Sequence, residues 1–215
     1  LRAGGNAIDA IIATAAVLTV VEPCSNGLGS DLFALIWSPQ DKALHGLNSS
    51  GRSPQAWTPD TFKGMDSVPM RGWMSVSVPG AIAGWVALSK RYGKLPFADL
   101  LAPAIDIAER GYMVTPIIAS QWARAVPILQ NQPGYAEHFM PHGRAPLPGE
   151  LFRNPAQAES LRLIAESEGE SFYRGQLAAR IVAHAKAHGG LMTGIDLAAH
   201  VADWVEPIRM GYRGY

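Results

Sequence analysis

The sequence predicts a domain of mixed helices and strands, of the α/β (α+β) class, and three observations carry this prediction. Hydrophobic residues make up 48% of the 215 residues and charged residues only 17%, a balance typical of a chain with a well-buried interior. Two apolar runs of strand length flank a polar turn near residue 40. Segments with a 3.6-residue apolar period then dominate from residue 79 onward.

The first predicted element is a helix over residues 6–21. Asn6 can cap it, and Asp9 places a negative charge in its first turn, where the helix dipole favours one. The rest of the run is apolar on every face, which indicates a helix buried on all sides. A glycine-containing loop, residues 25–31, follows it. Strands are then predicted at residues 32–37, 43–47 and 72–78.

The later elements are predicted from caps and breakers. Helices are expected over residues 79–92, over 97–110 with a break at Pro103, from Asn154 onward, over 176–188, and briefly after Thr193. Residues 127–150 carry five prolines and no clear period, so an irregular surface segment is expected there. The chain begins at Leu1 and ends at Tyr215 in a strand-like stretch, which is the pattern of a fragment.

Composition argues against two broad classes of function. Eighteen basic residues balance eighteen acidic ones and are spread along the chain, so a general role on nucleic acid or a membrane surface gains no support. The longest apolar run, residues 10–21, is shorter than the roughly 20 residues that span a bilayer. A single cysteine, Cys24, excludes an internal disulfide and slightly favours the cytoplasm, while a periplasmic or secreted location stays open.

Common catalytic and metal-binding signatures do not account for a function. The phosphate-binding, dinucleotide-binding and nucleophile-elbow motifs do not occur. Two H-x-x-x-H pairs, His138/His142 and His184/His188, have no third ligand near them in the sequence, so no metal site is predicted. Cys24 follows the carboxyl end of a helix, which does not activate a thiol.

The segment LNSSGRSP, residues 47–54, contains the candidate binding residues. Arg52 carries a permanent charge in a small polar loop, and Ser49 and Ser50 offer hydroxyl donors beside it. A guanidinium is the preferred partner of a planar carboxylate. An arginine in a loop is more often simply solvated, so the residues alone leave both interpretations open.

Several short motifs occur in order along the chain. They are GGNAIDA at 4–10, VEP at 21–23, VPGAIAGW at 78–85, YGKLP at 92–96, FYRG at 172–175 and YRGY at 212–215. Taken together, these motifs resemble the large subunit of the γ-glutamyltranspeptidase (glutathione hydrolase) family, in its glutathione-hydrolase-like branch. They run in order along the whole chain, which makes the resemblance more specific than any single motif.

This resemblance implies an N-terminal-nucleophile hydrolase with an αββα sandwich. A precursor of this kind cuts itself before a threonine, and the new terminal threonine attacks a γ-glutamyl amide with its own amine as base. That threonine would open a small subunit beyond Tyr215. Residues 1–215 are then an incomplete large-subunit portion that holds no catalytic residue and is inactive alone. The implied partner is the small subunit, association with a second copy of the enzyme stays open, and no cofactor is implied.

The candidate arginine departs from the family pattern. Members active on glutathione typically show Arg-Glu a few residues before the proline, and in that register Ser50 takes the arginine's place. Arg52 lies two residues nearer to Pro54, and Ser30-Asp31 stand where many members continue in glycine. Three hypotheses follow: a γ-glutamyltransferase or glutathione hydrolase, an amidohydrolase or acylase acting on another small amide such as oxamate, and a non-catalytic helical binding module.

Overall fold

A computed structural model describes residues 1–214 of the chain, and Tyr215 lies outside the described residues. The helices are α1 Ala7–Val21, α2 Ala81–Tyr92, α3 Phe97–Arg110, α4 Pro116–Leu129, α5 Tyr135–Phe139, α6 Pro155–Glu166, α7 Glu170–Tyr173, α8 Gln176–Ala187 and α9 Gly194–Ala198. The strands are β1 Leu32–Ser38, β2 Ala43–Ser49, β3 Tyr112–Met113, β4 Leu151–Phe152 and β5 Asp203–Val205. Short 3₁₀ turns occupy Pro59–Phe62 and Trp73–Ser75.

Helix α1 begins as the sequence predicts and is held in place by its cap. The Asn6 side chain accepts hydrogen bonds from the backbone N–H groups of Ile8 and Asp9, and the Asp9 carboxylate accepts one from Asn6 at 2.8 Å. The same carboxylate accepts the Lys94 N–H at 3.0 Å, which joins the start of α1 to the α2–α3 connection. One buried carboxylate therefore fixes two segments far apart in the sequence.

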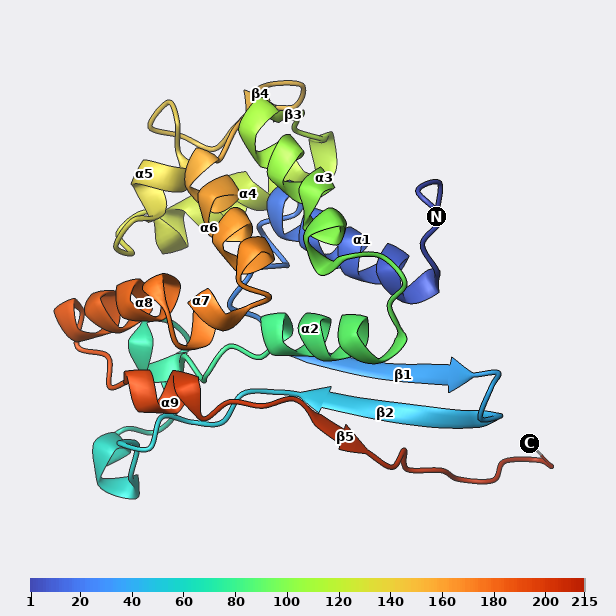
Figure 1. Ribbon diagram of the computed structural model, residues 1–215. Coiled ribbons are helices and arrows are strands. Elements are labelled where there is room, and N and C mark those ends of the chain that lie inside the picture. The colour runs from blue at the N-terminus through green and yellow to red at the C-terminus, as the bar shows by residue number, and fades with distance from the viewer. Residues whose placement is uncertain (215) are drawn as a thin grey trace.

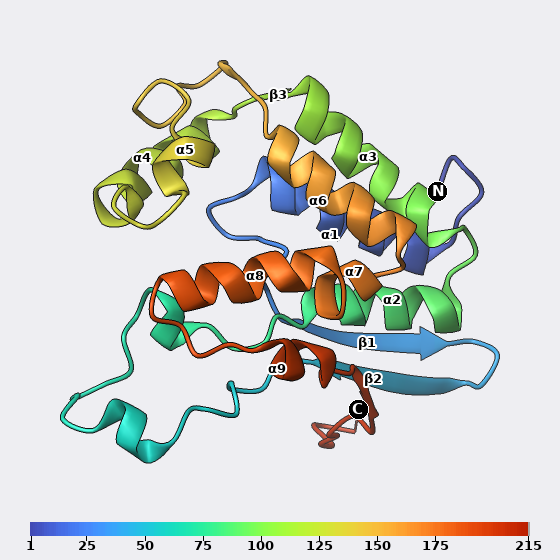
Figure 2. The ribbon, with the colours of Figure 1, turned by 60° about the vertical axis from the view of Figure 1, so that its left-hand side comes forward.

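Strands β1, β2 and β5 form an antiparallel sheet in that order. The predicted hairpin is confirmed, with Leu32 opposite Ser49 and Ser38 opposite Ala43. The short strand β5 arrives from the far end of the chain and pairs with the other side of β2. In both ribbon views α2 lies along one face of the sheet, and α1, α3 and α6 form a layer beyond it (Figures 1 and 2).

On the other face of the sheet, β1 presents large apolar side chains that are mostly exposed in residues 1–214. Phe33, Leu35 and Trp37 alternate along β1 on this face and are 69%, 68% and 60% exposed. Their neighbours Ala34 and Ile36 point the other way, toward the helices, and pack in the main core. We call Phe33, Leu35 and Trp37 the outer face of β1.

Several sequence expectations are corrected by the structure, two of them in the middle of the chain. Residues 72–78 are not a strand, because Trp73, Val76 and Val78 pack on α8 and α9 instead of pairing with the sheet. Helix α3 runs through Pro103 without a break. The carbonyl that loses its partner there belongs to the exposed Asp99, where water can replace the bond, and packing of α3 on its neighbours outweighs the local cost.

The remaining differences concern the proline-rich segment and the end of the chain. The segment 127–150 is not wholly irregular, because α4 reaches Leu129 and α5 forms within it. The last strand is β5, and residues 206–214 contain no further strand. Among the helices of residues 1–214, none combines the length and the apolar character needed to cross a bilayer.

Candidate substrate-binding site

A cavity of about 300 Å³ opens where β2 ends. Four segments meet there: the loop after β2, the residue before the Pro79 turn, the end of α9 and the start of β5. The cavity is lined by Ser50, Arg52, Ser53, Gln55, Val78, Asp196, Ala199, His200, Val201 and Asp203. Polar and charged side chains from both halves of the sequence are thus gathered at one place.

The loop after β2 is fixed by close backbone packing against residues 78–80. The Val78 N–H donates to the Arg52 carbonyl at 2.9 Å. A β-carbon on Gly51 would lie 1.4 Å from the Val78 carbonyl oxygen, and one on Gly80 would lie 1.7 Å from the Ser49 carbonyl oxygen. Only glycine fits at either position, so the backbone that carries Arg52 has little freedom to move.

The glycine-containing loop before β1 completes this scaffold. The Ser30 carbonyl accepts the N–H groups of Gly80 at 3.0 Å and Ala81 at 2.8 Å. The Asp31 carboxylate accepts the Gly51 N–H at 2.8 Å and the Ser50 hydroxyl at 3.3 Å. Ser30 and Asp31 therefore have structural roles at the site.

The three residues predicted from LNSSGRSP take different places. Arg52 and Ser50 line the cavity, and Arg52 is exposed, with no carboxylate of residues 1–214 within ion-pair distance. Ser49 is fully buried, and its hydroxyl donates to the Gly80 carbonyl at 2.7 Å. The structure thus brings Arg52 and Ser50 together at the cavity and places Ser49 behind them as a support.

His200 is a cavity residue that sequence reasoning missed. Its ring stacks on Tyr173, with centroids 5.5 Å apart and planes 24° apart, and its Nε2 lies 3.4 Å from the Ser49 hydroxyl oxygen. Burial lowers the pKa of His200 below its usual 6.5; Asp31 and Asp203 act in the opposite direction, and Arg52 adds to the lowering. The imidazole is therefore neutral at pH 7.

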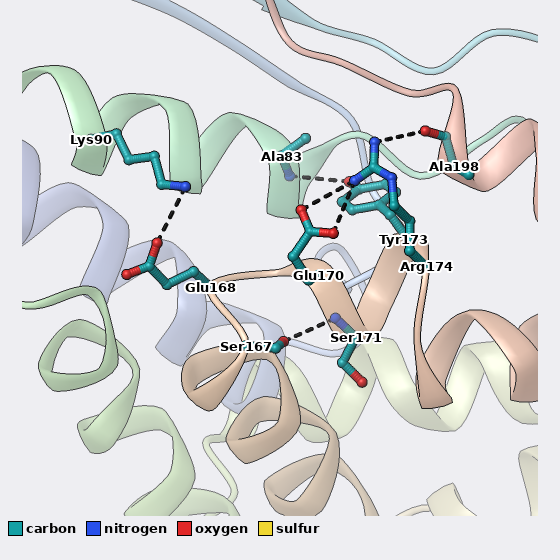
Figure 3. A network of polar contacts seen from close by, with 9 residues as sticks. All are labelled: Ala83, Lys90, Ser167, Glu168, Glu170, Ser171, Tyr173, Arg174 and Ala198. Carbon is teal, nitrogen blue, oxygen red and sulfur yellow. Dashed lines mark hydrogen bonds and ion pairs between the residues drawn. The ribbon is translucent and has the colours of Figure 1, made fainter.

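The FYRG segment supports this side of the cavity through Tyr173 and Arg174. Figure 3 shows the bonds of these two side chains to Ala83 and Ala198. The Tyr173 hydroxyl donates to the Pro79 carbonyl at 2.8 Å and accepts the Ala83 N–H at 3.0 Å. Burial raises the pKa of Tyr173, so this hydroxyl keeps its proton. The neighbouring Arg174 donates to the Ala198 carbonyl at 2.7 Å and so holds the end of α9, just before His200.

Asp196 lines the cavity but is occupied by the fold. Its carboxylate caps α9 by accepting the Thr193 N–H and hydroxyl at 2.8 and 2.7 Å, and it accepts the Gln55 N–H at 2.9 Å. Burial alone would raise its pKa, but these hydrogen bonds outweigh burial and lower it. Asp196 is therefore an ionised anchor for the loop that follows Arg52.

The metal and thiol candidates do not join this site. His184 and His188 have ring centroids 4.3 Å apart, and His184 Nδ1 accepts the Trp73 indole N–H at 3.1 Å. Residues 1–214 contain no cluster of three or more potential metal ligands. Desolvation and the nearby Glu22 carboxylate raise the pKa of Cys24, which is the reverse of what an activated thiol requires.

The missed residues differ in the signals they give. Asp31 follows a glycine loop, and an acidic residue there indicates a bond to backbone N–H groups. His200 belongs to no motif, and its contact with Ser49 depends on long-range packing. The pairing of β5 with β2, the stacking of the ring on Tyr173 and the bond from Arg174 to Ala198 all contribute.

The motifs and this arrangement agree with a comparison against protein families. The family model described as Gamma-glutamyltranspeptidase matches residues 1–215. The chain belongs to the γ-glutamyltranspeptidase family. The match over the whole length removes the hypothesis of a binding module with an accidental resemblance.

Relatives within the family have several activities in their names. The chain is 42% identical over 216 residues to the glutathione hydrolase-like YwrD proenzyme of Bacillus subtilis, and this match covers 100% of the chain and 41% of the relative. It is 39% identical over 219 residues to the oxamate amidohydrolase proenzyme of Klebsiella pneumoniae, covering 99% of the chain and 41% of the relative. The chain thus spans about 41% of the length of these γ-glutamyltranspeptidase relatives.

Solved structures share the fold. A cephalosporin acylase from Bacillus halodurans superposes with a TM-score of 0.94 at 50% identity, covering 99% of this chain and 41% of that one. The γ-glutamyltranspeptidase of Helicobacter pylori superposes with a TM-score of 0.94 at 30% identity, covering 100% of this chain and 63% of that one. The mixed helix-and-sheet fold predicted from the sequence is that of N-terminal-nucleophile hydrolases of this family.

Proposed function

We propose that residues 1–215 are an incomplete large-subunit portion of an enzyme that cleaves amides through an acyl-enzyme, with a γ-glutamyl amide as the first candidate substrate. The observation that carries this proposal is the cavity at the end of β2 in a chain of this family. Arg52 presents its guanidinium there on a rigid backbone, with no ion-pair partner among residues 1–214. The part of this chain in the reaction is to hold the carboxylate of the substrate. Ser50 contributes a hydroxyl beside it.

The chemical step belongs to a threonine that the rest of the precursor supplies. Its hydroxyl oxygen attacks the amide carbon, its terminal amine takes the hydroxyl proton, and the proton passes to the departing amine as the C–N bond breaks. An ester to the threonine is left. Water or the amine of an acceptor amino acid then attacks this ester and restores the free threonine. A carboxylate held by Arg52 would place the amide carbon at a fixed distance from that threonine.

The outer face of β1 supports the two-subunit part of the proposal. A row of three exposed large apolar side chains on a sheet face is uncommon in a complete soluble protein. Because the chain spans about 41% of its relatives, the remaining chain is long enough to supply a second layer. We assign the small subunit of the same precursor to this face.

A second candidate function has its own support. Ser50 stands where glutathione-active members place an arginine, and relatives named as an oxamate amidohydrolase and a cephalosporin acylase are as similar to the chain as those named for glutathione. Arg52 would then bind the carboxylate of another small amide, such as oxamate. Both candidates use the same cavity and the same threonine chemistry.

The test is the full-length gene product. We expect it to cut itself into two chains on a denaturing gel and then to release the amine product from glutathione or from oxamate. The 215-residue chain, purified alone, is the control and should hydrolyse neither. A full-length product that stays uncut and inactive, or hydrolysis by the 215-residue chain, would contradict the proposal.

A further inference from the structure

His200 lines the same cavity as Arg52, and its hydrogen bonding leaves one ring nitrogen without a described partner. The Ser49 hydroxyl has one proton, which it donates to the Gly80 carbonyl at 2.7 Å. In its 3.4 Å contact with His200 the hydroxyl oxygen can therefore only accept, so Nε2 carries the imidazole proton. In the neutral ring Nδ1 is then an acceptor that no donor of residues 1–214 occupies.

The ring is held firmly in this place. Tyr173 stacks against it, and Tyr173 is itself bound to Pro79 and Ala83 on both sides of its hydroxyl. Arg174 fixes the carbonyl of Ala198, two residues before the histidine. A ring fixed at the wall of a cavity contacts whatever occupies that cavity.

The charged groups that face the imidazole come from three other segments. Arg52 lies on the loop after β2, Asp31 on the loop before β1, and Asp203 at the start of β5. Asp196, on α9, also lines the cavity, but backbone and hydroxyl donors occupy its carboxylate. The permanent cation beside the imidazole is thus Arg52, and protonation of His200 would place a second positive charge beside it.

We propose that His200 is a second substrate-contacting residue of this cavity and that it distinguishes a carboxylate flanked by an ammonium group from a carboxylate alone. The inference rests on one part of the proposed function, namely that Arg52 holds the carboxylate of the ligand. In its neutral form His200 offers Nδ1 as an acceptor to an α-ammonium group. In its protonated form it repels an ammonium group and attracts a carboxylate. A γ-glutamyl substrate carries both groups, whereas oxamate carries the carboxylate alone.

The test uses two ligands that differ only in this respect and contain no amide. L-Glutamate has an ammonium group where 2-hydroxyglutarate has a hydroxyl, and neither is consumed by an amidase. Their dissociation constants are measured by calorimetry on the full-length, self-cleaved protein at about pH 7.5 and about pH 5, on either side of the ordinary histidine pKa. Taking the ratio of the two constants cancels every pH effect that both ligands share.

We expect the preference for L-glutamate over 2-hydroxyglutarate to fall at least about fivefold between the two pH values, which is the effect of one unit charge about 4 Å from another when the pair is fully screened by water. The variant His200→Gln keeps an N–H donor for Ser49 but does not titrate, so its ratio should change less than about twofold. His200→Phe keeps the stacked ring and serves if the first variant misfolds. His142→Gln, on an exposed loop, should behave as the wild type.

The outcomes separate the inference from the proposed function. If the enzyme hydrolyses amides but His200→Gln and the wild type show the same pH dependence, the inference fails alone. If no amide is hydrolysed but the ratio still depends on His200, the proposed function fails and the inference stands. Failure of both ligands to bind overturns the inference.

Discussion

The loop 49–52 and the outer face of β1 belong to one hairpin, yet they are completed in different ways. The loop is satisfied within the chain: its buried serine, its glycine and the carbonyl of Arg52 all have partners. The outer face of β1 has none in residues 1–214, and its apolar side chains are more than half exposed. The difference indicates that residues 1–214 form the cavity by themselves but leave one face of β1 open, the face to which we propose that the small subunit binds.

The sharpest way to break the loop is Gly51→Ala. The new β-carbon would meet the Val78 carbonyl at 1.4 Å, so the loop or the segment 78–80 must move. We expect a loss of about 4 kcal/mol or more in the free energy of unfolding, or no folded protein. Denaturant unfolding measures this free energy. The control is Gly29→Ala, where a β-carbon meets nothing within 4 Å and little change in stability is expected. If the two variants were equally stable, the close contact between Gly51 and the Val78 carbonyl would not limit this position.

Leu35→Glu in the full-length precursor tests whether the small subunit covers the outer face of β1. A charge buried against the small subunit costs several kcal/mol unless it is paired, so assembly and self-cleavage should drop several-fold. In the isolated 215-residue chain the same change should raise solubility. Ile117→Glu, on the 71% exposed Ile117 of α4, is the matched control. Normal processing of the Leu35 variant would place this face in solvent.

Arg52→Ala removes a charged group from the loop without touching its backbone bonds. A charge-assisted hydrogen bond to a carboxylate is worth about 1.5–3 kcal/mol, so we expect KM for an anionic amide to rise roughly 10- to 100-fold. Self-cleavage should be impaired far less. Arg71→Ala, on the exposed connection before α2, is the control. An unchanged KM would remove Arg52 from the site.

The smallest effect is expected at Asp9, which belongs to neither region. Burial alone would raise its pKa, but backbone N–H groups of Asn6, Lys94 and Leu95 outweigh burial and lower it below 3.8. A lowered pKa means that Asp9 stabilises the fold above pH 3.8 and loses this contribution as the pH falls through the folded-state value. Asp9→Asn should lower the free energy of unfolding at pH 7 by about 1–3 kcal/mol. The free energy of unfolding should then also depend less steeply on pH below pH 3.8.

The measurement for Asp9 is denaturant unfolding at a series of pH values. Asp66→Asn, on the exposed connection before α2, is the control and should leave the curve in place. An Asp9 variant with wild-type stability at every pH would show that the three backbone bonds contribute no net stability.

What the sequence predicts well is local. The caps of α1, α6 and α9 each join residues three positions apart, and the hairpin joins two strands that follow one another directly in the sequence. All four are confirmed. The break expected at Pro103 does not occur, because the free-energy cost of a proline inside a helix depends on whether the carbonyl that loses its hydrogen bond can reach water. The strand expected at 72–78 failed because its alternating valines are buried by α8 and α9, which the local pattern cannot reveal.

The site divides in the same way. Arg52 and Ser50 could be selected from their residue types and from a family resemblance. The supporting role of Ser49 depends on Gly80, and the presence of His200 depends on the pairing of β5 with β2, so neither is visible in a local pattern. Long-range packing, and not residue chemistry, sets the limit of the sequence-based prediction.

The contact between Ser49 and His200 joins residues 151 positions apart, and this has a consequence during synthesis. At about 5–20 residues per second, a ribosome needs roughly 8–30 seconds to deliver the second residue after the first. Until then the edge of β2 that pairs with β5 has no partner strand, and the cavity lacks the wall formed by His200 and Asp203. The nascent chain therefore carries an open sheet edge for many seconds, which makes a holding chaperone most useful between the emergence of β2 and that of β5.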